Sequence, residues 1–238
     1  MDDVTARTAL IAACQRLNPL GINQGNAGNI SLRAGDAMLI SPSGIPYDQL
    51  RPELIAQMSL DLDQPAITTP DDPTGIWTSP WTGPCKPSSE WRFHRDILRA
   101  RPEITAIVHT HAIFATTLAI AHRPIEACHY MIACFGGHDV RCAPYATFGT
   151  QALSDHALVA LEGRTACLLA NHGMIALGAT LERALWRAVE LETISKQYIH
   201  ALMLGQPHIL SRADINEALA QFATYGHASP LAKTATFR

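Results

Sequence analysis

Two histidines one residue apart form a candidate metal site. His109 and His111 lie in an apolar stretch, residues 106–112, that resembles a buried strand reaching the edge of a sheet. Side chains at positions i and i+2 of a strand point to the same side, so we expect both imidazoles to face one point. Neutral imidazole is a good ligand for zinc and neighbouring metals. A chain with 11 histidines can also contain such a pair by chance, so further ligands must come from elsewhere.

Three other side chains occupy positions from which they could contribute to such a site. His172 lies at a glycine turn between two apolar strands, Glu90 lies in the first turn of a helix, and Tyr130 lies in a largely apolar run. Each also has a plain structural interpretation. The histidine could satisfy a turn, the carboxylate could interact with the helix dipole, and the tyrosine could belong to the core. The residues alone leave these alternatives open.

Three stretches of small polar residues could bind an anion. The segment 23–29 reads NQGNAGN, and its glycines and asparagines tolerate positive φ angles that let backbone N–H groups converge. The segment 41–46, SPSGIP, adds hydroxyl and N–H donors, and Ser88 with Ser89 offers the same at a helix start. The loops could equally be ordinary turns, and the serines could simply cap the helix.

Composition restricts the class of protein. Of 238 residues, 47% are hydrophobic and 16% are charged, which provides enough apolar material for a full core. The formal net charge of −3, without a block of like charges, disfavours a nucleic-acid partner. The N-terminus lacks a signal pattern and no apolar run approaches the ~20 residues that span a bilayer, so we expect a cytoplasmic protein without a membrane partner. The six cysteines include no C-x-x-C pair and are expected to be mostly small buried hydrophobic residues.

Hydrophobic spacing predicts helices and strands that could position these residues. Helices are expected at 3–18, 88–99, 113–121, 151–162, 180–203 and 211–222, and strands at 30–33, 38–40, 58–62, 106–112, 140–143, 166–170 and 174–177. The segment 63–87 contains six prolines and two tryptophans and is expected to be a long irregular connection rather than a domain boundary. We therefore expect a single domain over residues 1–238, with a mobile tail after about residue 226.

Seven motifs occur in the order in which one known family carries them. They are NQGNAGNISLR, ISPSGIPYDQL, KPSSEWRFH, AIVHTHA, HYMIA, APYATFG and LLANHGMIALG. Together they resemble the class II aldolase/adducin family, most closely its L-fuculose-1-phosphate aldolases, over about residues 5–226. The resemblance implies an α/β fold, a three-layer α/β/α sandwich with a mixed, largely antiparallel central sheet. It also implies a homotetramer whose active sites lie between subunits.

The resemblance also assigns roles to individual residues. The ligands of one Zn²⁺ per subunit, with Mn²⁺ or Co²⁺ as alternatives, correspond to His109, His111, His172 and Glu90. Glu90 also matches the acid-base residue, and Tyr130 matches a proton donor from a neighbouring subunit. The phosphate-binding positions correspond to Gly28, Asn29, Ser43, Gly44, Ser88 and Ser89.

The implied reaction is the reversible cleavage of a ketose 1-phosphate, of the L-fuculose 1-phosphate type, to dihydroxyacetone phosphate and an aldehyde such as lactaldehyde. Breaking a carbon–carbon bond beside a ketone leaves a carbanion that needs an electron sink. The lysines lie before a helix, within a helix and in the tail (Lys86, Lys196 and Lys233), so none is placed to form a Schiff base. A metal ion held by neutral histidines would supply the sink.

Other activities remain open. The same cleavage of a 5-deoxy- or methylthio-pentulose 1-phosphate would change only the aldehyde, and the segment 63–87, which is longer than its counterpart in the family, leaves the aldehyde undecided. A relative in the family could instead be a sugar-phosphate epimerase, dehydratase or decarboxylase, although the motifs HYMIA and APYATFG with Tyr130 favour an aldolase. An adducin-like interaction module would not need the three histidines and Glu90 together.

Overall fold

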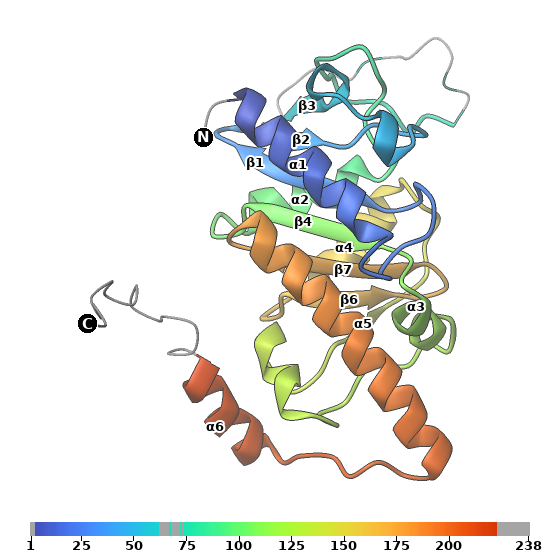
Figure 1. Ribbon diagram of the computed structural model, residues 1–238, viewed down its shortest axis with the longest axis vertical. Helices are drawn as coiled ribbons and strands as arrows, with labels where there is room; N and C mark the ends of the chain where they lie inside the picture. Colours follow the sequence, from blue (N-terminus) through green and yellow to red (C-terminus); the bar gives the residue numbers. More distant parts are fainter. Residues whose placement is uncertain (1–2, 62–66, 68–71, 73, 223–238) are drawn as a thin grey trace, which may run out of the picture.

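The computed structural model describes residues 3–61, 67, 72 and 74–222, and a seven-stranded sheet runs through its centre (Figure 1). The strand order is β3-β2-β1-β4-β7-β6-β5. Every neighbouring pair is antiparallel except β5 and β6, which are parallel. The strands are β1 (Asn29–Ala34), β2 (Ala37–Ile40), β3 (Ala56–Ser59), β4 (Ala106–Thr110), β5 (Cys142–Ala143), β6 (Ala166–Leu169) and β7 (Gly173–Gly178). The mixed, largely antiparallel sheet is as predicted.

Helices cover both faces of this sheet. The α-helices are α1 (Asp3–Leu17), α2 (Trp91–Ala100), α3 (Ile113–Ile120), α4 (Gln151–Ala160), α5 (Leu181–Leu204) and α6 (Arg212–Phe222), and the 3-10 helices are η1 (Tyr47–Gln49), η2 (Pro52–Leu54) and η3 (Tyr130–Phe135). In Figure 1, α1 and α5 cross the front of the sheet, while α2 and α4 lie behind it. Buried residues of α1, α3 and α5 form one apolar cluster with the sheet, and those of α2 and α4 form a second. The three-layer α/β/α fold is therefore confirmed.

The central strands are apolar on both sides, which is why helices must cover both faces. In β4, Val108 belongs to the first cluster and Ile107 to the second, and in β7 the same holds for Met174 and Ile175. Successive side chains of a strand point to opposite faces, so a strand that is apolar throughout is stable only inside a layered core. Every residue of β4 and β7 is buried. Polar side chains near these strands are consequently surrounded by core.

The strands expected at 30–33 and 38–40 pair with each other as an antiparallel hairpin. Gly35 lies in its turn with φ of 61°, a value that glycine adopts without strain. The next strand differs from the prediction, because β3 ends at Ser59 instead of covering 58–62. Ser59 pairs with Ala37, which is the first residue of β2. β2 therefore has no further residue with which a longer β3 could pair. The alternation of apolar and polar residues in the sequence therefore extends beyond the last residue of β3 that pairs with β2.

Two other elements begin later than predicted. The strand expected at 140–143 is divided, because Val140 forms a single bridge with Ile125 and only Cys142 and Ala143 pair with β6. The helix expected from residue 88 begins at Trp91. Both differences arise from partners that are distant in the sequence.

The proline-rich segment lies partly outside the described residues. Its continuous described stretch, 74–87, contains no helix, and its strand structure is limited to single bridges at Thr82 and Pro87. Trp77 Nε1 donates to Pro87 O at 2.8 Å, so the segment is folded back on itself before α2. The predicted tail after residue 226 is outside the described residues. The single domain stays a prediction, in keeping with two apolar clusters that share one sheet.

None of the helices in the described part of the chain is long and apolar enough to cross a membrane.

Candidate metal centre

The four residues predicted as metal ligands meet beside the end of β4. One ligand atom from each lies within 4.8 Å of the others, and the residues are Glu90, His109, His111 and His172. They come from β4 and the residue after it, from the residue before α2, and from the turn between β6 and β7. Glu90 and His109 are buried, and the other two are half-buried. This group can hold a metal ion.

His109 and His111 converge as the strand spacing predicts. Their Nε2 atoms lie 3.2 Å apart, and their rings meet edge to face with centroids 5.1 Å apart. β4 ends at Thr110, so His111 lies one residue beyond the strand and still points to the same side. Phe93 of α2 packs edge-on against His109 with centroids 5.4 Å apart. Core packing therefore fixes the buried His109 ring.

A tight turn directs His172 toward the other imidazoles. Asn171 adopts φ of 54°, a conformation that asparagine tolerates better than most residues. A Cβ at Gly173 would lie 2.5 Å from Thr110 O and 2.9 Å from His111 Cδ2. Only glycine lets β7 approach β4 this closely beside the histidines. The ring centroid of His172 consequently lies 5.1 Å from that of His111.

Glu90 faces the histidines instead of capping its helix. It occupies the position before Trp91, the first residue of α2, and its side chain makes no cap hydrogen bond. Its Oε2 lies 3.0 Å from His109 Nε2, and its Oε1 lies 3.0 Å from His172 Nε2. Burial opposes ionisation, but positive charge on His109 and His172 outweighs it and holds the pKa of Glu90 well below its ordinary value, as a cation bound between them would. The carboxylate is therefore ionised and directed at the cluster.

The donor atoms fit a divalent cation. His109 Nδ1 lies 2.9 Å from Met174 O, which can only accept, so in the neutral ring Nδ1 carries the hydrogen and Nε2 presents a lone pair. That lone pair faces Glu90 Oε2 at 3.0 Å and His111 Nε2 at 3.2 Å. Burial, reinforced by His109 and His172, lowers the pKa of His111 to about 4, which disfavours a proton as the bridge. Glu90 Oε1 also accepts no hydrogen bond from the described residues. One metal ion would satisfy all these atoms.

A buried chain of polar side chains lies behind Glu90. Asn29 Nδ2 donates to Glu90 Oε2 at 2.9 Å, and His94 Nε2 lies 2.6 Å from Asn29 Oδ1. Ser31 Oγ lies 2.7 Å from His94 Nδ1. Burial, with a smaller contribution from His109 that Glu90 opposes, lowers the pKa of His94 to about 3, so its ring is neutral. Neither His94 nor Ser31 was among the predicted site residues. The signal was the four-residue spacing of Glu90 and His94, which places both on one helix face.

The second and third predicted anion-binding stretches are joined beside Glu90. Ser43 N donates to Lys86 O at 3.0 Å, and Ser88 N donates to Ser41 O at 3.0 Å. Ser88 Oγ accepts from the N–H of Glu90 at 3.3 Å, so this serine does bind the helix start. Since these N–H groups of Ser43 and Ser88 are used within the protein, the donors that the two serines can offer an anion are their hydroxyls.

The local structure at the remaining predicted phosphate positions, Gly28, Gly44 and Ser89, is compatible with an anion site. A Cβ at Gly28 would lie 2.7 Å from His109 O and 2.9 Å from Asn23 Oδ1, so this glycine permits close approach of the loop to the metal-binding strand. Gly44 adopts φ of 75° in its turn, and Ser89 is half-buried. Their roles in binding phosphate stay predictions.

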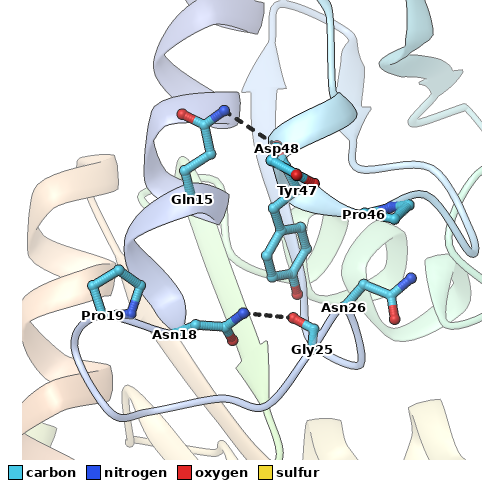
Figure 2. A pocket seen from close by; sticks show the side chains of 8 residues that line it. All are labelled: Gln15, Asn18, Pro19, Gly25, Asn26, Pro46, Tyr47 and Asp48. Atoms are coloured by element: carbon cyan, nitrogen blue, oxygen red, sulfur yellow. Dashed lines mark hydrogen bonds between the residues drawn. The ribbon is translucent and has the colours of Figure 1, made fainter.

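A hollow of about 530 Å³ lies beside the loop that follows α1. Figure 2 shows the residues that line it, Gln15, Asn18, Pro19, Gly25, Asn26, Pro46, Tyr47 and Asp48. Tyr47 Oη donates to Gly28 O at 2.6 Å and accepts from Asn23 Nδ2 at 3.2 Å. Burial, with Cys14 adding to it, raises the pKa of Tyr47, so its hydroxyl keeps the proton. Tyr47 thus anchors the loop at the residue before Asn29.

Tyr130 lies at the surface. It begins η3 and is 56% exposed, which excludes the interpretation as a core tyrosine. Among the described residues its ring stacks on His129, with centroids 4.8 Å apart, and lies parallel to Phe222 at 6.4 Å. A hollow of about 390 Å³ between η3, α5 and α6 adjoins it. An exposed hydroxyl is what donation to a neighbouring subunit would require, and this role stays a prediction.

Comparisons with known proteins agree on one family. A family model described as Class II Aldolase and Adducin N-terminal domain matches residues 8–199. The chain is 48% identical over 223 residues to a 5-methylthioribulose-1-phosphate/5-deoxyribulose-1-phosphate aldolase of Rhodospirillum rubrum, covering 94% of this chain and 93% of that protein. It is 44% identical over 218 residues to an L-fuculose phosphate aldolase of Escherichia coli O6:H1, covering 91% and 94%. A solved structure of an L-fuculose 1-phosphate aldolase matches with a TM-score of 0.83 and 33% identity, covering 94% and 98%.

Proposed function

Because this chain belongs to the class II aldolase and adducin N-terminal domain family and is an aldolase, we propose that it cleaves a ketose 1-phosphate to dihydroxyacetone phosphate and an aldehyde. The observation that supports this most directly is the convergence of Glu90, His109, His111 and His172 within 4.8 Å, with serine hydroxyls beside them. An interaction module would gain nothing from burying a carboxylate against three imidazoles, since unpaired buried charge is costly.

The three histidines and Glu90 are proposed to hold one Zn²⁺. Three neutral imidazoles and a carboxylate are donors that zinc prefers, and Mn²⁺ or Co²⁺ could use the same set. A bound metal would polarise the ketone of the substrate and stabilise the negative charge that develops on its oxygen. Met174 O would support this role by fixing the His109 tautomer with the lone pair on Nε2.

Glu90 is proposed as the acid-base residue. The substrate's ketone oxygen and adjacent hydroxyl would displace its carboxylate from the cluster, and it would then move the proton on the carbon beside the ketone. Positive charge beside the carboxylate, on His109 and His172 or on a bound metal in their place, outweighs burial, lowers the pKa of Glu90 and keeps it ionised until then. The carboxylate is buried, so bulk water competes little for that proton.

The phosphate is proposed to bind where the three loops meet. The donors would be hydroxyls, backbone N–H groups and one amide, from Gly28, Asn29, Ser43, Gly44, Ser88 and Ser89. The Asn29 amide nitrogen carries two hydrogens, and only one is needed for its bond to Glu90 Oε2. The other could serve the phosphate, which would connect substrate anchoring to the acid-base residue.

A homotetramer with shared sites is proposed as the working assembly. Several large apolar side chains are more than half exposed in the protomer and would be covered in such an assembly: Ile113, Ile120, Tyr130, Tyr145 and Phe148. In the condensing direction Tyr130 would then donate a proton to the aldehyde oxygen in the site of a neighbouring subunit, and in cleavage it would take that proton back from the substrate hydroxyl.

The aldehyde half distinguishes two candidate substrates. The Rhodospirillum rubrum relative is named for 5-methylthioribulose 1-phosphate and 5-deoxyribulose 1-phosphate, and the Escherichia coli relative for L-fuculose phosphate. The higher identity to the former favours a pentulose 1-phosphate with an apolar end, and L-fuculose 1-phosphate is the second candidate. In both cases the phosphorylated fragment and the bond chemistry are the same.

Product analysis tests the proposal. The metal-loaded protein is incubated with 5-methylthioribulose 1-phosphate, 5-deoxyribulose 1-phosphate and L-fuculose 1-phosphate, and each aldehyde is identified alongside dihydroxyacetone phosphate. We expect cleavage of at least one substrate, with the highest kcat/KM for a pentulose. If none of the panel releases dihydroxyacetone phosphate, the aldolase proposal is wrong for these substrates and an epimerase or decarboxylase assay follows.

A further inference from the structure

The chain Ser31–His94–Asn29–Glu90 arises where one helix crosses one strand. Glu90 and His94 are four residues apart at the start of α2, and Asn29 and Ser31 are two residues apart on β1. Helix positions i and i+4, and strand positions i and i+2, each present side chains on a single side. Two rows of two polar groups therefore face each other in the core, joined by contacts of 2.6, 2.7 and 2.9 Å.

The contacts define a single direction of donation. The ionised Glu90 carboxylate only accepts, so the nitrogen end of Asn29 faces it and Asn29 Oδ1 faces the other way. An amide oxygen also only accepts, so His94 Nε2 must donate to it. In a neutral ring the other nitrogen, Nδ1, then accepts, and the Ser31 hydroxyl donates to it. Each group in the chain has one orientation that satisfies its neighbours.

We propose that His94 is a positioning residue, whose Nε2–H holds the Asn29 amide with its nitrogen toward Glu90 and thereby fixes the Glu90 carboxylate at the metal-binding cluster. The inference rests on the function proposed above for Glu90. Without a donor at Oδ1, the Asn29 amide can turn by about 180°, because its terminal torsion has two nearly equivalent wells. Its oxygen would then face Glu90 Oε2, and two acceptors at hydrogen-bond distance repel.

A purely structural role explains this row of hydrogen-bonded side chains less well. α2 is already fixed to the sheet by fully buried apolar side chains, including Trp91, Phe93 and Ile97. Another buried polar contact, in which Ser154 Oγ donates to Asp96 Oδ2 at 2.7 Å, ties it to α4. A completely buried imidazole is a costly way to add one more contact unless its direction matters.

Two amide variants distinguish the contributions of the two ring nitrogens of His94. In His94→Gln the side-chain nitrogen lies near the position of Nε2 and can still donate to Asn29 Oδ1. In His94→Asn the amide lies near the position of Nδ1, so it keeps a partner for Ser31 and loses the donor to Asn29. Both variants are polar and similar in size, so they differ mainly in the contact that the proposal requires.

The first readout is the visible spectrum of the Co²⁺-loaded proteins, which reports the metal ligands without catalysis. We expect His94→Gln to match the wild-type spectrum, and His94→Asn to show altered bands and weaker Co²⁺ binding by about tenfold. The second readout is kcat for dihydroxyacetone phosphate release. His94→Gln should remain within about threefold of wild type, and His94→Asn should lose about 10- to 100-fold.

Ser154→Ala is the matched control, since it removes a buried hydrogen bond of α2 away from the cluster. It should lower the unfolding temperature and leave the Co²⁺ spectrum and kcat unchanged. A spectrum altered as much in Ser154→Ala as in His94→Asn would overturn the proposal, because the effect would then be general loosening of α2. Identical spectra and kcat values in the Gln and Asn variants would overturn it as well.

Wild-type protein gives an independent test that needs no variant to fold. The ¹⁵N NMR shifts of labelled histidines identify the tautomer of each ring, and His94 is expected as the neutral Nε2–H form. A neutral Nδ1–H form would overturn the proposal. If wild-type protein cleaves no ketose phosphate, the proposed function fails, whereas the Co²⁺ and ¹⁵N spectra still decide the role of His94.

Discussion

Glu90 combines two tasks that place opposite demands on a carboxylate. A metal ligand must be ionised, while an acid-base residue must accept a proton once substrate is bound. Its position between His109 and His172, at 3.0 Å from each, favours the ionised form despite burial. The Asn29 amide adds a third contact to the same carboxylate. Single substitutions at this residue should therefore separate metal binding from turnover.

Glu90→Gln is expected to keep most of the metal and lose most of the activity. The amide retains the shape and an oxygen donor, and the three histidines remain, but it cannot carry the proton. Loss of general acid-base catalysis corresponds to a decrease in kcat of about 10²- to 10⁴-fold. Metal content by mass spectrometry and kcat are measured together, with Glu162→Gln at an exposed position as the control. Near-normal turnover with metal bound would contradict the acid-base role.

His94 should make the folded protein sensitive to acid. Burial is the main reason that its pKa is lowered from 6.5 to about 3, with His109 adding to the effect and Glu90 opposing it. An unfolded histidine takes up its proton near pH 6.5, so below that pH the unfolded state binds more protons than the folded state. The contribution of His94 to stability is thus present above about pH 6.5 and is lost as the pH falls toward about 3.

Urea midpoints at pH 7, 5 and 4 measure this effect, on metal-free protein so that metal release does not contribute. Wild type should lose more stability between pH 7 and pH 4 than His94→Gln, because glutamine has no group that titrates in this range. Equal losses in the two proteins would show that His94 does not remain neutral in the folded state.

At the scale of elements, the registers of β1, β4 and β7 bring the site together. Asn29 pairs with His109 across β1 and β4, and His109 pairs with Ile175 across β4 and β7. The second register also places Met174 O against His109 Nδ1. Glycines without room for a Cβ, at positions 28 and 173, permit the close approach of the neighbouring segments. The metal site therefore depends on sheet geometry as much as on its ligands.

Gly173→Ala is expected to disturb the metal site through the backbone. The new Cβ would lie 2.5 Å from Thr110 O and 2.9 Å from His111 Cδ2, and backbone atoms cannot move aside without shifting β4 or β7. We expect weaker metal binding and a lower unfolding temperature. Gly35→Ala is the comparison, because this residue has φ of 61° with open space around it. It should cost about 1–2 kcal/mol of stability through backbone strain and leave metal affinity unchanged.

Equal metal affinity in the two glycine variants would contradict this explanation. The outcome would mean that the turn between β6 and β7 adapts without moving His111 or His172.

At the scale of the whole molecule, one protomer supplies the metal-binding cluster and an exposed Tyr130. The tyrosine lies beside α6 and is 56% exposed, while Glu90 is buried at the end of the sheet. An exposed tyrosine can reach the site of a neighbouring subunit, so we propose an assembly in which subunits exchange the two groups that the reaction would use together. This arrangement can be tested by co-expressing two variants, each of which lacks one of the two groups.

Co-expression of Tyr130→Phe with Glu90→Gln should restore activity that neither variant has alone. If Tyr130 acts in a neighbouring site, intact sites form wherever a subunit with Glu90 meets a neighbour with Tyr130, which is about a quarter of the sites at equal expression. The measurement is kcat per subunit of the mixed assembly, with tetramer mass checked by sedimentation. Activity no greater than the sum of the separate variants would show that Tyr130 serves its own subunit or none.

The sequence determined the features that depend on local periodicity and local geometry. The i, i+2 spacing of His109 and His111 fixed their convergence, because any strand imposes it. The three layers were predicted from the resemblance to the family, and the apolar residues of β4 and β7, which need cover on both faces, explain them. The motif order identified the family.

Only the tertiary structure decided the features that depend on partners distant in the sequence. β3 ends at Ser59 because β2 has no residue before Ala37 with which it could pair. The alternation within 58–62 could not show where the partner strand begins. The carboxylate of Glu90 lies against His109 and His172 instead of capping α2, because β4 and the turn between β6 and β7 bring both rings to the start of that helix. The orientation of the Asn29 amide follows from His94, which lies 65 residues away along the chain and meets it only when α2 crosses β1.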